Sequence, residues 1–211
     1  MQEQSVKEND KRIFKNTVFL YIRMFIVMLV SLYTSRVVLS TLGVTDYGIF
    51  NVVAGVVVMM NVVNGAMSSS TQRYLTFALG KKDYQGLRRT FNMCMNIFIG
   101  LSVLVLILGE TVGLWFVNTY LVIPLERMQA ANWVYQFAIF SCICTLLNNP
   151  YMAVITAHER MNVYAYVGII EAVLKLLIVY LLLVIPMDRL IVYGFLTFLS
   201  SFVVTLIYHI Y

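Results

Sequence analysis

Glu171 and Lys175 stand four positions apart inside an apolar stretch of this 211-residue chain. On a helix, with ~100° between successive residues, one face holds four side chains within about 60° of one another: Tyr164, Gly168, Glu171 and Lys175. Two interpretations stay open. The pair is either a self-neutralised packing element in the favourable i, i+4 order, or it lines a pathway in which Lys175 attracts an anionic ligand that Glu171 helps to position.

A second set of polar residues recurs at intervals of three and four along an expected helix: Asn61, Asn64, Gly65, Ser68 and Gln72. The stripe ends in Arg73, within a segment that is too polar to face lipid on any side. Small and amide residues of this kind often make hydrogen bonds between helices in a membrane. For the stripe as a whole, we favour a water-filled vestibule lined by cationic groups.

Arg23 lies about a turn and a half inside the first apolar run, and Ser31 and Thr34 fall within about 80° of it. Its side chain either extends to the nearby headgroups or faces a cavity. The candidate binding residues are therefore these eight: Arg23, Asn61, Asn64, Ser68, Gln72, Arg73, Glu171 and Lys175.

Motifs for catalysis are not found in the sequence. It contains no GxxxxGK[ST] loop, no HExxH and no CxxC, and His158 beside Glu159 has no second metal ligand nearby in sequence. The three cysteines all lie in apolar stretches, where packing is the simplest role. We therefore expect no enzyme, no catalytic residue, no metal and no cofactor.

The composition indicates the elements that hold these residues. The chain is 61% hydrophobic and 12% charged, against roughly 45–50% and 25% for a soluble domain, and its mean hydropathy is +0.83. These values indicate an all-α integral membrane protein. The net charge of +5 does not point to nucleic acid, because the basic residues cluster between apolar runs, as in membrane proteins.

Six apolar runs are long enough to cross a bilayer core of about 30 Å. They cover residues 17–38, 49–79, 91–117, 130–155, 163–185 and 190–211. No connection is long enough for a separate soluble domain, so residues 1–211 are expected to form one unit of six helices. The last run has no polar flank, which we interpret as the sign of a fragment or truncated chain.

The basic residues predict the orientation. Nine lie on the side of the N-terminus: Lys7, Lys11, Arg12, Lys15, Lys81, Lys82, Arg88, Arg89 and Arg160. Three lie on the other side: Arg36, Arg127 and Arg189. Because cytoplasmic loops are enriched in Lys and Arg, we expect a cytoplasmic N-terminus.

Several segments together resemble a known family over nearly the whole chain. Residues 32–39 (LYTSRVVL) and 42–50 (LGVTDYGIF) resemble the first outer loop of polysaccharide exporters of the multidrug/oligosaccharidyl-lipid/polysaccharide (MOP) flippase superfamily, which includes Wzx-type O-antigen flippases and the distant MATE drug exporters. Four further stretches are similar to the same group: 71–75 (TQRYL), 110–116 (ETVGLWF), 123–127 (IPLER) and 157–161 (AHERM).

The resemblance implies one lobe of a bacterial inner-membrane transporter with two pseudo-symmetric six-helix lobes. Its substrate would be a polyprenyl-pyrophosphate-linked oligosaccharide used for surface polysaccharide or lipopolysaccharide, and its partners would be membrane lipid and a second lobe or another copy of the chain. A pyrophosphate crossing hydrocarbon needs positive charge, which we expect from Arg23, Arg73 and Lys175. Two alternatives are a cation-coupled MATE-like drug exporter that uses Glu171, and an inactive remnant.

Overall fold

The computed structural model describes residues 2–60 and 62–210, and all regular elements in these two ranges are helical. The seven α-helices are α1 (Gln2–Met60), α2 (Val62–Gly80), α3 (Tyr84–Leu108), α4 (Leu114–Thr119), α5 (Met128–Ala157), α6 (Met161–Val184) and α7 (Arg189–Ile210). A π-helix, η1 (Gly109–Gly113), joins α3 to α4, and a 3-10 turn, η2 (Leu125–Arg127), precedes α5.

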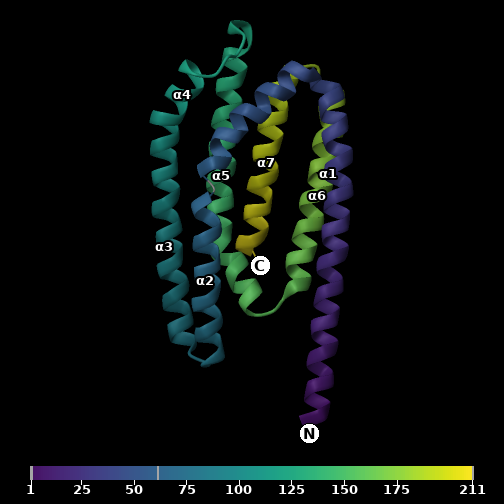
Figure 1. The fold of residues 1–211 in the computed structure, drawn as a ribbon, viewed down its shortest axis with the longest axis vertical. Helices are drawn as coiled ribbons and strands as arrows, with labels where there is room; N and C mark the ends of the chain where they lie inside the picture. The colour runs from purple at the N-terminus through teal and green to yellow at the C-terminus, as the bar shows by residue number, and fades with distance from the viewer. Residues whose placement is uncertain (1, 61, 211) are drawn as a thin grey trace.

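Helix α1 contains a sharp turn at Gly43, whose φ of 79° and ψ of 169° are not helical. A positive φ of this size favours glycine, because a Cβ would be strained there. Figure 1 shows α1 rising from the N-terminus to the far end of the molecule, turning, and running back into α2. The sequence predicted a short connection at this place, and the chain instead resumes helix directly after one glycine.

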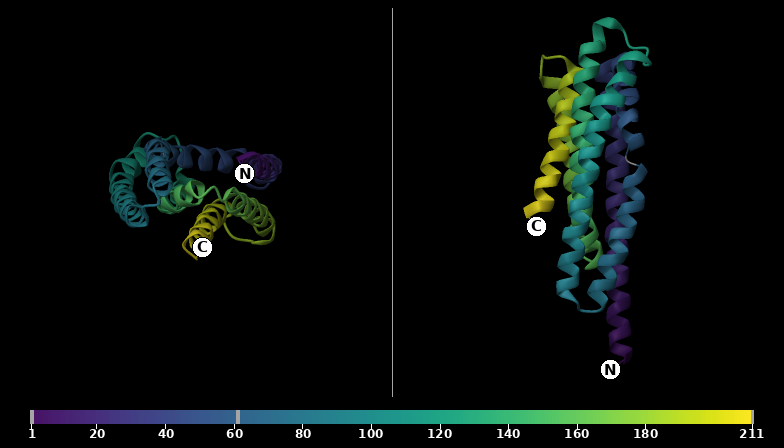
Figure 2. Two further views of the ribbon diagram at one scale, coloured as in Figure 1. Left: turned by 90° about the horizontal axis from the view of Figure 1, so that it is seen from below. Right: turned by 90° about the vertical axis from the view of Figure 1, so that its left-hand side faces the viewer.

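Helix α5 is the centre of the bundle and packs against α7, α3, α2 and α1, while α6 packs mainly against α1. Viewed from the N-terminal end, α5 lies between the α2–α3 pair and the pair formed by α1 and α6 (Figure 2). Its buried side chains include Tyr135, Ile139 and Leu146, and they meet Val53 of α1 and Phe98 of α3. Helix α5 continues through Pro150, although a proline inside a helix removes one backbone hydrogen bond.

Five helical stretches are long and apolar enough to cross a membrane: Thr17–Met59, Tyr84–Thr119, Leu125–Ala157, Met161–Val184 and Arg189–Ile210. Many large apolar side chains on them are exposed, as expected for surfaces that face lipid. Six separate spans are not confirmed. The first stretch runs through the Gly43 turn, and α2 is not among the five because its middle, residues 68–73, is polar.

An ion-pair network joins three connections at the end far from the N-terminus. Arg127 pairs with Asp46, just after the Gly43 turn, at 2.7 Å, and with Asp188, before α7, at 2.6 Å. Arg189 donates to the Thr41 carbonyl at 3.1 Å. The Asp46 side chain is only 8% exposed, so its charge depends on this partner. The network holds the turn of α1 against the starts of α5 and α7.

Basic residues gather at the opposite end. Lys81 and Lys82 lie in the turn after α2, Arg88 lies near the start of α3, and Arg160 lies between α5 and α6. Figure 1 shows that these connections lie at the same end as the N-terminus. The two-sided division of charge that the sequence predicted is therefore present in the fold.

Candidate functional site

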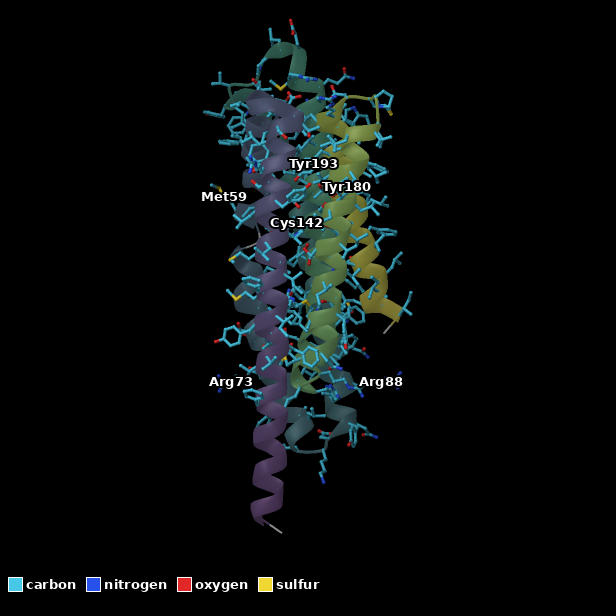
Figure 3. All side chains as sticks on the ribbon, turned by 90° about the vertical axis from the view of Figure 1, so that its right-hand side faces the viewer. Met59, Arg73, Arg88, Cys142, Tyr180 and Tyr193 are labelled. Carbon is cyan, nitrogen blue, oxygen red and sulfur yellow. The ribbon has the colours of Figure 1, made fainter. Side chains whose placement is uncertain are left out.

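A cavity of about 280 Å³ lies between α1, α5, α6 and α7, near the middle of the bundle. We call it the central cavity. Its wall is rich in polar groups, with an arginine, a lysine, a glutamate, two asparagines, three tyrosines and several hydroxyls among the residues that line it. One of these tyrosines, Tyr193 of α7, is labelled in Figure 3. So much polarity between apolar helices is typical of a binding site or pathway.

Arg23 of α1 lies against α6 and lines the central cavity. Its guanidinium carbon lies 4.1 Å from the centre of the Tyr164 ring, a cation–π contact. Its Nε occupies the space beside Gly168, where an added Cβ would lie only 2.0 Å from that nitrogen. Of the two roles left open by the sequence, the structure favours the cavity-facing one.

The Glu171 and Lys175 side chains form an ion pair at 2.8 Å, and both line the central cavity together with Tyr164 and Gly168. The shared face predicted from their spacing is confirmed. Each side chain is 42% exposed, so the pair is only partly enclosed by the bundle and is not expected to contribute much to stability. Because the pair is neutral overall, Arg23 leaves the ionisable groups of the cavity wall with a formal charge of +1.

Three buried polar atoms on the cavity wall have no hydrogen-bond partner among the described residues: Arg23 Nε, Thr34 Oγ1 and Asn148 Oδ1. Asn148 is only 8% exposed. A buried polar atom without a partner costs about 1–3 kcal/mol, and such atoms are rare in folded proteins. Their convergence on one cavity indicates that a polar ligand or water belongs there.

Helix α7 supplies hydroxyl groups that the sequence reasoning missed. Tyr193, Thr197, Ser200, Ser201 and Tyr208 line the cavity. Thr197 and Ser201 donate to carbonyls one turn earlier, at 2.7 and 3.2 Å, and their oxygens can still accept hydrogen bonds. The i, i+3 and i+4 spacing of these residues is the signal that would have identified them. Asn148 of α5 also lines the cavity and was not among the predicted residues.

The described residues of the polar stripe predicted at residues 61–73 do not line the central cavity. Asn64 accepts a hydrogen bond from Asn149 of α5, and Asn149 lines the cavity while Asn64 does not. Ser68 and Gln72 are half-buried on α2 and also do not line it. Asn61 lies outside the described residues. For Asn64, the packing alternative, a hydrogen bond between helices, is the one observed.

Arg73 lies apart from Arg23 and Lys175. Its side chain is exposed on α2, and it does not line the central cavity. In Figure 3, Arg73 and Arg88 project from opposite sides of the lower part of the bundle. Of the three cations expected to act together, the structure brings together only Arg23 and Lys175.

The donors and acceptors of the central cavity suit a ligand with several oxygens and negative charge. Guanidinium and ammonium groups bind phosphate oxygens, and hydroxyl and amide groups match a sugar or a hydrated headgroup. Among the described residues, no three His, Cys, Asp or Glu side chains are grouped to hold a metal ion. Comparison with protein-family models, curated proteins and solved structures found no match.

Proposed function

We propose that this chain is one lobe of a transporter that flips polyprenyl-pyrophosphate-linked oligosaccharide across the bacterial inner membrane for surface polysaccharide or lipopolysaccharide synthesis. The observation that carries the proposal is the central cavity, whose wall holds the cations Arg23 and Lys175 together with buried polar atoms that have no hydrogen-bond partner among the described residues. In this proposal, Arg23 and Lys175 contact the pyrophosphate. Glu171 holds the Lys175 ammonium group in place until the substrate arrives.

The dimensions of the cavity support a headgroup as the occupant. A volume of about 280 Å³ is slightly below the 300–1,000 Å³ of ordinary ligand pockets. It suits a pyrophosphate and an adjoining sugar, whereas a whole oligosaccharide needs more room. The proposal therefore includes a second six-helix lobe or another copy of this chain that completes the path.

The proposal includes six membrane passes and a cytoplasmic N-terminus. The passes are the part of α1 before Gly43, the rest of α1 with α2, α3 with α4, and then α5, α6 and α7. The end that carries the N-terminus also carries the larger share of lysine and arginine. This is the asymmetry that the positive-inside rule relates to a cytoplasmic side.

A cation-coupled drug exporter is less well supported by the same cavity. Such a mechanism needs a carboxylate that is available to a coupling ion, and Glu171 is already paired with Lys175 at 2.8 Å. An excess of cationic over anionic side chains also disfavours cationic drugs. An inactive remnant would leave the unpartnered polar atoms without a use.

The test is carried out in a bacterium that encodes the chain. Arg23→Ala and Lys175→Ala are each expected to lower surface polysaccharide at least tenfold, because a buried headgroup loses a charge-assisted contact. Arg36→Ala is the matched control, since Arg36 is an exposed cation on the same helix and does not line the cavity. Polysaccharide is measured on gels, and protein level by immunoblot.

Unchanged polysaccharide in both cavity variants, at normal protein level, would refute the proposed roles of Arg23 and Lys175. Increased sensitivity to cationic drugs with normal polysaccharide would instead favour the exporter. If deletion of the chain affects neither phenotype, the remnant interpretation is supported.

A further inference from the structure

A second cavity, of about 500 Å³, lies at the N-terminal end of the molecule between α3, α5 and α7. We call it the end cavity. Its cationic and imidazole groups come from three places: Arg88 on α3, His158 and Arg160 at the α5–α6 connection, and His209 on α7. The chain has two histidines, and both line this cavity. None of the described residues that line it is acidic, in contrast to the central cavity with its Glu171.

Aromatic side chains hold one of the imidazoles in position. His209 lies over Tyr151 with 4.6 Å between ring centres, and the Tyr151 hydroxyl is 3.1 Å from His209 Nε2. Tyr151 in turn meets the edge of Phe91 at 5.5 Å. The ring of His209 therefore does not need to be ordered when a ligand binds, which lowers the entropic cost of binding.

The other imidazole has a defined hydrogen-bonding state. His158 Nδ1 lies 2.9 Å from the Val154 carbonyl, and because a carbonyl only accepts, Nδ1 carries the proton. Nε2 then holds the lone pair and can accept a hydrogen bond from water or from a protonated ligand oxygen. His158 and Arg160 both line the end cavity.

The remaining wall is apolar and lies where helices end. Leu87, Val154 and Ile155 line the cavity between the basic groups, and Arg88 lies only a few residues from the start of α3. Basic groups at helix ends, with aromatic rings beside them, occur at the level of lipid headgroups. The apolar wall and the basic groups of the end cavity together match a molecule with an anionic phosphate and an apolar tail.

We infer that the end cavity binds a phosphate group, supplied by an anionic phospholipid in the leaflet at this end or by free phosphate. Tyr208 lines both cavities and forms part of the wall between them. The inference concerns a site separate from the central cavity. It holds whether or not the central cavity carries a transported substrate.

The experiment measures ligand binding by the purified chain in a neutral detergent. Dihexanoyl-phosphatidylglycerol, inorganic phosphate and uncharged dihexanoylglycerol are titrated separately, with the unfolding temperature as the readout. Arg88→Gln is expected to raise the Kd for phosphatidylglycerol about fivefold, because one cation near the headgroup is lost. Arg89→Gln is the matched control, since Arg89 is the next residue on α3, is exposed and does not line the cavity.

The two sources of phosphate give different results. A lower Kd for phosphatidylglycerol than for inorganic phosphate identifies a lipid site. Equal Kd values for the two ligands identify a site for free phosphate. His209→Phe keeps an aromatic ring against Tyr151 but removes the two polar ring nitrogens, and it is expected to weaken ligand binding by more than it changes the unfolding temperature of the ligand-free protein. The inference would be overturned if phosphatidylglycerol bound the two cavity variants, Arg88→Gln and His209→Phe, as tightly as the Arg89→Gln control. It would also be overturned if uncharged dihexanoylglycerol bound the wild-type chain as tightly as phosphatidylglycerol does.

Discussion

Arg23 Nε lies in the space that a side chain on Gly168 would fill, because an added Cβ would be 2.0 Å from that nitrogen. The guanidinium can lie against α6 and over the Tyr164 ring only because position 168 has no side chain. This contact between the first and the sixth α-helix sets the position of the cation in the central cavity. It also leads to the most direct test of the site.

Gly168→Ala is expected to displace Arg23 and to lower surface polysaccharide nearly as much as Arg23→Ala. The added methyl group meets only the flexible Arg23 side chain, which can move aside, so the substitution changes the position of the guanidinium more than it changes stability. Gly100→Ala is the control, since nothing lies within 4 Å of a Cβ built there and alanine favours helix. Wild-type polysaccharide with Gly168→Ala would show that the position of Arg23 is not needed.

Glu171→Gln separates the two transport mechanisms. The substitution breaks the 2.8 Å ion pair and leaves Lys175 as a free cation, so an anionic headgroup should bind at least as well as before. Polysaccharide is therefore expected to stay within about twofold of wild type, a rate difference that corresponds to a small change in free energy. A loss comparable to that of Lys175→Ala would favour the coupling-ion role of Glu171.

Arg127 is expected to couple more strongly to Asp46 than to Asp188. The Asp46 side chain is 8% exposed and the Asp188 side chain 33%. Removing Arg127 therefore leaves the Asp46 carboxylate unpaired in the less solvated environment, which costs more than it does at Asp188. We expect a coupling free energy of about 1–3 kcal/mol for the first pair and below about 1 kcal/mol for the second. Double-mutant cycles of unfolding in detergent measure both values, and a larger value for Asp188 would contradict the prediction.

Asn148→Leu is expected to keep or raise stability while lowering transport. The substitution removes a buried oxygen that has no hydrogen-bond partner and therefore relieves a cost of about 1–3 kcal/mol. Sites of function often carry such a cost. The unfolding temperature and surface polysaccharide are measured side by side with those of Asn149→Leu, which loses its bonds to Asn64 and Thr145. Lower stability for Asn148→Leu than for Asn149→Leu would contradict this account.

Arg73→Ala is expected to change polysaccharide less than Arg23→Ala. Arg73 is exposed on α2 and does not line the central cavity, although its position in a polar stripe had placed it with the other cations. Surface polysaccharide in the two strains, at equal protein level, provides the comparison. An equal loss in both would mean that the path of the substrate passes along α2.

The features that the sequence predicted correctly are those that depend on neighbours along the chain. The shared face of Tyr164, Gly168, Glu171 and Lys175 follows from the helical repeat, which places residues three and four apart together. The helical class follows from long apolar runs, which satisfy their own backbone hydrogen bonds. The gathering of basic residues at one end follows from the number and order of the helices.

Only the tertiary structure decided which faces meet. Helical spacing gave Asn64, Ser68 and Gln72 a common face that ends beside Arg73, but packing against α5 bonds Asn64 to Asn149 and leaves Arg73 exposed. The turn at Gly43, the pairing of Arg127 with Asp46 and the contact of Arg23 with Gly168 all join residues from different helices or turns. Local periodicity determines the faces of each helix, whereas the partner of each face depends on how whole helices pack, which is a property of the complete bundle.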